Sequence, residues 1–292
     1  FAHLYFPHTV KVKNDLKNVD VKLQTEITQK LLHDNVSCIA EASFIKDDLF
    51  CAVDLLLKDQ DSYSIYEVKA STSIKSHLDE YCADVAFQKY VLEKCGLKIN
   101  KCYILHLNPD YVRHGDIDIH QLLIPHSLNH DSVFDSQVDL VAGNLDDLRR
   151  TANMEDVEYG PACSSSCDFL DYCHRDLEKP NVVYINGVTK KKAHEYIANN
   201  IITFMDLRRA GITFPHPRKQ AQIDAYLNNT PTIYNPTLIK DFLKTVKYPL
   251  YHLDFETMNE AIPPFDNTKP YEQIPFQYSL HIEMSPGGEL KH

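Results

Sequence analysis

Residues 49–69 read LFCAVDLLLKDQDSYSIYEVK, and this stretch decides the fold. Its two ends are apolar and rich in strand-forming residues, which predicts strands over residues 49–57 and 63–69. The five residues between them, 58–62, are polar and turn-prone. Two strands joined in this way predict a β-hairpin.

Three charged residues, Asp54, Glu67 and Lys69, lie within these two predicted strands. Alternate residues of a strand share a face, so Asp54 points the same way as Leu56, and Glu67 points the same way as Lys69. If the register places Asp54 beside the other two, a pair of carboxylates and one ammonium meet in an apolar sheet. Burying such a group is costly unless a cation offsets the negative charge.

Mg²⁺ is a suitable cation, because it prefers a few carboxylates together with water and phosphate oxygens. A metal held in this way polarises a phosphate and lowers the pKa of a bound water. The ammonium of Lys69 can orient that water or stabilise charge on phosphorus. The pattern is therefore typical of phosphodiester hydrolysis. The alternative is a set of solvent-facing charges in weak surface pairs, because short motifs of this kind recur by chance.

The segments around the hairpin supply the context. Residues 21–33 predict a helix, and residues 36–45 alternate as a strand, with Cys38, Ala40, Ala42 and Phe44 on one face. Glu41 is an acidic residue within that strand.

Residues 76–95 predict a helix that contains Gln88, with Ser76 as its N-cap and Gly96 just beyond its end. Residues 101–107 predict a further strand. The order of helix, three strands, helix and strand predicts an α/β core, with a central mixed sheet flanked by helices.

Glu41 and the strands around Asp54, Glu67 and Lys69, with the helix segment 84–88 that ends at Gln88, resemble the RecB-like branch of the PD-(D/E)XK nucleases. This branch includes the iron–sulfur exonucleases of CRISPR adaptation. The resemblance implies that Asp54 and Glu67 bind Mg²⁺ or Mn²⁺, that Lys69 is catalytic, that Glu41 supports the metal site and that Gln88 lies near it. It implies a DNA nuclease, an exonuclease acting on single strands or ends.

Many members of this branch also carry a metal-binding histidine upstream. His33 is the nearest candidate here, and an exposed histidine at a helix end is the favoured interpretation of it. Among the scattered basic residues, we expect only Lys75 to contact DNA, because it closely follows the strand that carries Lys69.

Three cysteines, Cys163, Cys167 and Cys173, lie close together after the predicted core, and His174 follows directly. Such a density of thiols suits a soft metal, but three thiolates complete neither a four-thiolate zinc site nor a four-iron cluster. His174 could complete a zinc site. The resemblance instead favours a structural [4Fe-4S] cluster, whose fourth cysteine we expect upstream of Phe1.

Near the end of the chain, Asp254 and Glu256 lie on one face of a predicted strand, within HLDFET. This arrangement is similar to the first motif of DnaQ-like exonucleases, which hold metals with it and have an RNase H-like fold. The segments 262–265 and 276–281 add a resemblance to a bacterial family of unknown function. That family joins a RecB-like nuclease to a DnaQ-like domain.

The resemblance divides the chain into three parts. Residues 1–178 form the nuclease domain with its cysteine cluster, residues 179–246 form a helical linker region, and residues 247–292 begin a DnaQ-like domain. The remaining acidic motifs of a DnaQ-like site do not occur before His292, so we expect that second site to be incomplete.

Composition limits the alternatives. The 292 residues carry a formal net charge of −11, which disfavours a protein that coats nucleic acid through bulk electrostatics. No secretory signal or apolar run long enough for a bilayer is visible, so we expect a cytoplasmic protein that does not contact a membrane. Two rivals to the nuclease are a catalytically inactive module that binds nucleic acid or a partner protein, and a zinc-binding regulatory protein.

Overall fold

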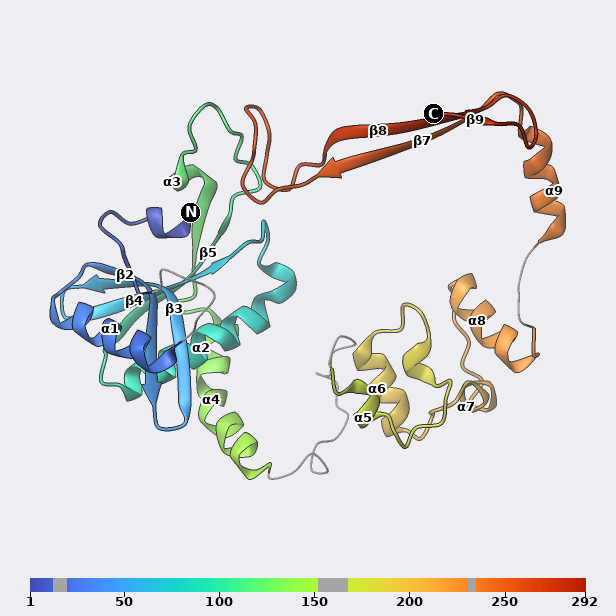
Figure 1. Cartoon of the computed structure of the whole chain (residues 1–292). Coiled ribbons are helices and arrows are strands. Elements are labelled where there is room, and N and C mark those ends of the chain that lie inside the picture. Colours follow the sequence, from blue (N-terminus) through green and yellow to red (C-terminus); the bar gives the residue numbers. More distant parts are fainter. Residues whose placement is uncertain (13–19, 152–167, 231–234) are drawn as a thin grey trace. The chain divides into compact units, whose positions relative to one another are not determined.

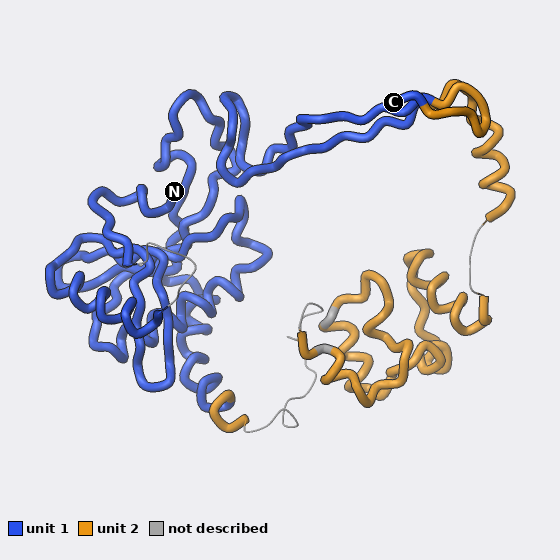
Figure 2. The backbone as a smooth tube through the Cα atoms, in the orientation of Figure 1, with its two compact units in different colours: residues 1–147, 251–282, 291–292 blue, residues 148–250, 283–290 orange. Residues whose placement is uncertain are grey.

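The computed structural model describes residues 1–12, 20–151, 168–230 and 235–292 (Figure 1). These residues form two compact units (Figure 2). The first unit contains residues 1–147, 251–282 and 291–292, and the second contains residues 148–250 and 283–290. The ranges expected from the sequence, 1–178, 179–246 and 247–292, group the chain differently and stay a prediction.

The first unit is built on a six-stranded mixed sheet with the order β1-β2-β3-β4-β5-β6. Strands β1 and β2 are parallel, as are β4 and β5, and the other neighbours are antiparallel. The strands are β1 (Val10–Lys11), β2 (Cys38–Lys46), β3 (Leu49–Asp59), β4 (Ser62–Lys69), β5 (Ile99–Leu107) and β6 (Leu123–Ser127). The α/β class expected from the sequence is confirmed at this level.

Helices cover one face of the sheet. They are α1 (Val21–His33), α2 (Leu78–Lys94) and α4 (Ser132–Arg150), and their apolar side chains join one core cluster with those of the strands. Helix α2 lies between β4 and β5 in the chain, because two parallel strands need a crossover connection. This crossover places α2 on the face that carries the candidate site.

The opposite face of the sheet has its own apolar cluster, which includes Leu55 of β3 and Leu105 of β5. The segments that cover it are the N-terminal residues around η1 (Ala2–Leu4), helix α3 (Ile119–Leu122) and the connection between β7 (Leu250–Met258) and β8 (Ile274–Glu283). Both faces of the sheet are therefore buried, which explains why its strands are so apolar.

Two local predictions need correction. The link between β3 and β4 is only Gln60 and Asp61, and Gln60 has a φ of 52°, so the hairpin turn is tighter than the predicted five residues. Ser76 is not the N-cap of α2, because it lies inside the 3-10 turn η2 (Lys75–His77) and His77 takes the cap position. Gly96 does follow the helix, with a φ of 91° that suits glycine.

The second unit contains short helices around a small apolar core formed by Val182, Ile185, Phe204, Leu207 and Ile223, among others. Its elements are α5 (Leu170–Cys173), η4 (Val182–Tyr184), α6 (Lys190–Ala198), α7 (Phe204–Arg209), α8 (Pro217–Leu227) and α9 (Pro236–Thr245). This agrees with the predicted series of short helices. Among the described residues, none of the helices has the length and apolar character that a membrane span requires.

The last part of the chain forms a three-stranded sheet of β7 (Leu250–Met258), β8 (Ile274–Glu283) and β9 (Leu290–Lys291). The strand expected around Asp254 is therefore present as β7. Residues 251–282 belong to the first compact unit.

The core cluster beneath α2 predicts a large effect of truncation at Ile65, which is 0% exposed. Ile65→Ala should lower the free energy of unfolding by about 2–4 kcal/mol, because it removes buried methyl groups and leaves a cavity. Urea unfolding measures the change. Ile45→Ala, at a side chain that is 39% exposed on β2, should cost far less. Equal losses in the two variants would contradict this core assignment.

Candidate active site

Three acidic residues, Glu41, Asp54 and Glu67, form a row across β2, β3 and β4. The β2–β3 register pairs the two neighbours of Glu41 with the two neighbours of Asp54, so these two acids lie opposite each other. The paired residues of β3 and β4 end at Leu55 and Tyr66, which directly adjoin Asp54 and Glu67, and the Asp54 carboxylate accepts a hydrogen bond from the Val68 N–H of β4. The register on which the predicted site depended is therefore the observed one.

The alternation of side chains along β2 changes phase at Glu41. Cys38 and Ala40 pack in the cluster on one face of the sheet, whereas Ala42 and Phe44 pack in the cluster on the other. The prediction that these four share a face is therefore wrong. Glu41 has a φ of 59°, a left-handed conformation that non-glycine residues seldom adopt, and this irregularity accounts for the change. Strained backbone of this kind tends to occur at functional sites.

Glu67 is the most enclosed member of the row, with only 7% of its surface exposed. Its Oε2 accepts a hydrogen bond from Gln88 Nε2 of α2 at 2.8 Å, and its Oε1 accepts one from Lys69 Nζ at 2.6 Å. Lys69 on the same strand and Gln88 on the following helix, both expected near Glu67, are therefore in contact with it.

Lys69 lies between two carboxylates. Its Nζ is 2.6 Å from Glu67 Oε1 and 2.9 Å from Asp84 Oδ2, and it lies 5.1 Å from the centre of the Tyr81 ring. Burial alone would lower the pKa of Lys69, but the hydrogen bonds to Asp84 and Glu67 outweigh burial and hold the pKa above its ordinary value. These two contacts therefore favour the ammonium form of Lys69.

Asp54 is half-buried, and its Oδ2 accepts a hydrogen bond of 2.7 Å from the Val68 backbone N–H. Burial raises the pKa of Asp54; the Val68 bond acts against burial, and the negative charge of Glu41 adds to the rise. Burial and the Asp54 carboxylate likewise raise the pKa of Glu67 to about 7, although the bonds from Gln88 and Lys69 lower it. The row thus carries more negative charge than one ammonium offsets.

Asp84 is a member of this site that the sequence did not single out. It lies one helical turn before Gln88, and Gln88 Nε2 is 3.2 Å from its Oδ1. The spacing of four residues on α2 could have indicated it, because positions i and i+4 share a helix face. Asp84 is thus the second carboxylate that contacts the Lys69 ammonium.

His106 of β5 was also missed. The β4–β5 register places it beside Lys69, and it is 9% exposed. Its Nδ1 lies 3.0 Å from the Leu107 carbonyl oxygen, and burial lowers its pKa. Only the pairing of the parallel strands β4 and β5 places His106 beside Lys69, and the sequence does not reveal that pairing.

The donor set suits a divalent cation that keeps most of its ligands as water and phosphate. Asp54 and Glu67 offer hard carboxylate oxygens, and next to Glu67 the buried Oε1 of Gln88 has no hydrogen-bond partner within the described part of the chain. In residues outside the gaps at 13–19, 152–167 and 231–234, no three histidine, cysteine or acidic side chains form a ready metal cage. Mg²⁺ does not need such a cage, because one or two carboxylates suffice when the substrate supplies oxygens.

The other predicted site residues lie elsewhere. His33 is at the end of α1 with 89% of its side chain exposed, in agreement with the interpretation as an exposed helix-end histidine. Lys75 lies in η2, just before α2. Asp254 and Glu256 are both exposed on β7.

The cysteine site is described only in part. Cys163 and Cys167 lie outside the described residues, whereas Cys173 ends α5 and is half-buried. His174, which follows it, is 1% exposed, and burial lowers its pKa. The choice between a cluster and zinc therefore stays a prediction.

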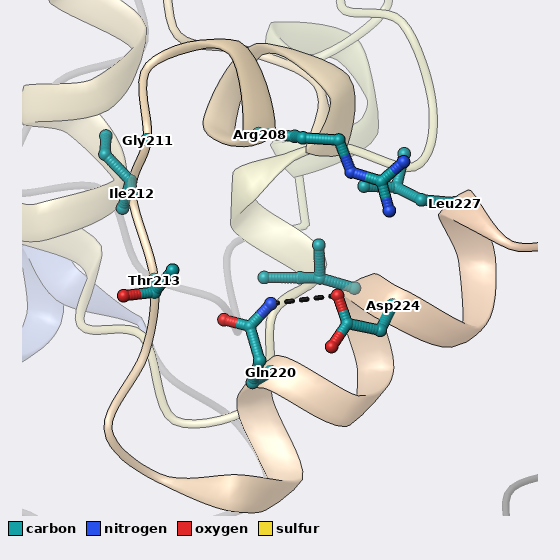
Figure 3. A pocket seen from close by; sticks show the side chains of 8 residues that line it. Arg208, Gly211, Ile212, Thr213, Gln220, Asp224 and Leu227 are labelled. Carbon is teal, nitrogen blue, oxygen red and sulfur yellow. Dashed lines mark hydrogen bonds between the residues drawn. The ribbon is translucent and has the colours of Figure 1, made fainter.

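A hollow of about 220 Å³ lies in the second unit between α7 and α8 (Figure 3). Two of the polar side chains that line it bond each other, since Gln220 Nε2 donates to Asp224 Oδ1 at 3.0 Å. Arg208, at its edge, donates to Asn228 Oδ1 at 3.3 Å. We assign no chemistry to this hollow.

Comparison with known proteins adds one similarity. Residues 251–292 match a family described as a domain of unknown function, DUF2779. The match covers β7, β8 and β9 and leaves the α/β core outside it. Among curated proteins, none matches this chain.

The raised pKa of Glu67 predicts how the stability of the metal-free protein depends on pH. The pKa of Glu67 is about 7 in the folded chain, whereas the ordinary pKa of a glutamate side chain is 4.5. The stabilisation from this group is therefore complete below about pH 4.5 and is lost as the pH rises through about 7. In EDTA, the free energy of unfolding of the native protein should fall between pH 5 and pH 8. This fall should exceed the fall in Glu67→Gln by on the order of 2–3 kcal/mol. Urea unfolding at several pH values measures this, and equal slopes in both proteins would contradict the assignment.

Proposed function

We propose that this chain is a metal-dependent nuclease that hydrolyses phosphodiester bonds in DNA, with single strands or DNA ends as its substrate. The observation that carries the proposal is the row of Glu41, Asp54 and Glu67 with the Lys69 ammonium at its end. We also propose that the first unit has a RecB-like PD-(D/E)XK core and that residues 247–292 begin a DnaQ-like domain with an RNase H-like fold.

Electrostatics support a divalent cation as the partner of this site. A row of carboxylates repels a phosphate, and the ammonium of Lys69 is already bound to two of the acids, Glu67 and Asp84. Mg²⁺ or Mn²⁺ at Asp54 and Glu67 would polarise the scissile phosphate and provide an activated water. Because Glu67 must give up its proton to act as a ligand, affinity for the cation should increase as the pH rises through about 7.

The chain's own residues have separate tasks in this proposal. Gln88 fixes one oxygen of Glu67, and the Val68 N–H fixes one oxygen of Asp54, so the two carboxylates are oriented before any ligand arrives. Asp84 holds Lys69 as an ammonium at the edge of the row. From there its N–H groups can orient the attacking water and stabilise the charge that grows on the phosphate oxygens.

The proposal predicts that Lys69→Ala and Asp54→Ala each reduce Mn²⁺-dependent cleavage of labelled DNA by about a hundredfold or more, because each removes transition-state stabilisation. Lys89→Ala and Asp59→Ala are matched controls. Lys89 makes an ion pair of 2.6 Å with Glu93 on α2, and Asp59 lies on the same strand as Asp54. Circular dichroism should show the same fold in all four variants.

Full cleavage by either site variant would overturn the nuclease assignment. Mn²⁺ should also raise the melting temperature of the native protein and of the Lys89→Ala variant, but not that of Asp54→Ala. This second measurement tests metal binding without requiring turnover.

We further propose that Cys163, Cys167 and Cys173 hold a structural [4Fe-4S] cluster. Protein purified without oxygen should contain iron and absorb visible light, and Cys173→Ser should lose both properties. Cys82→Ser, at a buried position of α2, should keep them. Zinc in place of iron would refute the cluster and would favour His174 as the fourth ligand.

A further inference from the structure

The connection between β7 and β8 belongs to the first unit and packs against its sheet. Ala261 and Ile262 pack against the apolar cluster on the face of the sheet opposite α2. Pro263 is buried as well. This connection belongs to the segment that matches the family of unknown function.

Arg113, in the loop between β5 and α3, holds the connection through several hydrogen bonds. Its Nη1 donates to the carbonyl oxygens of Pro263 and Pro264 at 3.0 Å and 2.9 Å. Its backbone N–H donates to the Thr268 carbonyl at 3.1 Å, and its own carbonyl accepts from the Asn267 N–H at 2.7 Å. Arg113 therefore has a structural role and is not one of the solvated basic residues.

Tyr271 extends this contact to the strand that carries Lys69. Its hydroxyl donates a hydrogen bond of 2.6 Å to the carbonyl oxygen of Ala70, the residue directly after Lys69. Tyr271 has a φ of 57°, which is unusual for a bulky side chain and has an energetic cost. The hydrogen bond joins residues that are 201 positions apart in the chain.

The contact lies where β4 ends. Lys69 is the last residue of β4 and pairs with His106 of β5. Beyond it, the Ser71 carbonyl accepts a hydrogen bond from the Leu107 N–H. Tyr271 thus restrains the Ala70–Ser71 peptide unit, one residue beyond Lys69 and directly before the Ser71 carbonyl.

We propose that Tyr271 is a positioning residue for Lys69, so that the segment of unknown function completes the active site of the α/β unit. This inference rests on the proposed nuclease function. Lys69 must keep its Nζ within reach of both Glu67 and Asp84, and a long side chain does so reproducibly only if its backbone is fixed. The Tyr271 hydroxyl adds a restraint at Ala70, between the last residue of β4 and the Ser71 carbonyl that is bonded to β5.

Tyr271→Phe tests the inference, because it removes one oxygen and keeps the ring. We expect kcat for DNA cleavage to fall about tenfold with KM unchanged, since a displaced catalytic group weakens the transition state and not substrate binding. Hydrogen exchange in a peptide spanning residues 66–74 should become faster, while the melting temperature stays nearly constant. Tyr278→Phe is the matched control, because Tyr278 lies on β8 with 67% of its surface exposed.

Arg113→Lys provides a second route to the same effect. It weakens the contacts to Pro263 and Pro264 and should release the connection, so kcat should again fall. Because both changes act through the Tyr271 hydroxyl, the double variant should be no worse than Arg113→Lys alone. Additive losses would overturn a single shared mechanism.

The outcomes separate this inference from the nuclease assignment. If the native protein cleaves DNA and Tyr271→Phe matches it in kcat and in exchange, Tyr271 does not position Lys69. If kcat falls but exchange at residues 66–74 does not change, the effect does not pass through the end of β4, and the inference is again overturned. If the native protein cleaves no nucleic acid while Tyr271→Phe still accelerates exchange, the restraint stands and the nuclease assignment fails.

Discussion

The repulsion among acids in adjacent strands is the constraint on which the site depends. Glu41, Asp54 and Glu67 lie side by side across β2, β3 and β4, and Glu67 is nearly buried. Burial and the neighbouring Asp54 carboxylate raise the pKa of Glu67 to about 7. The surrounding sheet must hold these groups together against their own charge, and two buried faces give it the packing to do so.

Both carboxylate oxygens of Glu67 and one of Asp54 accept hydrogen bonds from neighbouring groups. Gln88 and Asp84 come from one face of α2, and the β4–α2–β5 crossover places that face over the row. Lys69 offsets part of the negative charge and is itself kept protonated by the acids. The arrangement is preorganised for a cation and an anionic substrate, because the polar groups are already oriented before either one binds.

The contact between the β7–β8 connection and the core changes how the C-terminal segment is understood. A segment that matches a family of unknown function would ordinarily be treated as a separate module. Here Arg113 and Tyr271 join it to the loop after β5 and to the end of β4. Substitutions in that segment can therefore affect the candidate site of the α/β unit without any change in the site residues themselves.

The sequence alone predicted the α/β class and the hairpin, and it placed Asp54, Glu67 and Lys69 in the two hairpin strands, because apolar alternation is a local property. The contacts of Gln88 and Asp84 with Glu67 and Lys69 depend on how α2 crosses the sheet, and the place of His106 depends on a parallel strand pairing, so only the tertiary structure supplied them. The sequence also missed the change of phase at Glu41, because a left-handed φ at a glutamate has no signature in the pattern of side chains. The restraint from Tyr271 on Ala70 was decided only by tertiary structure, because it joins residues that are 201 positions apart in the chain.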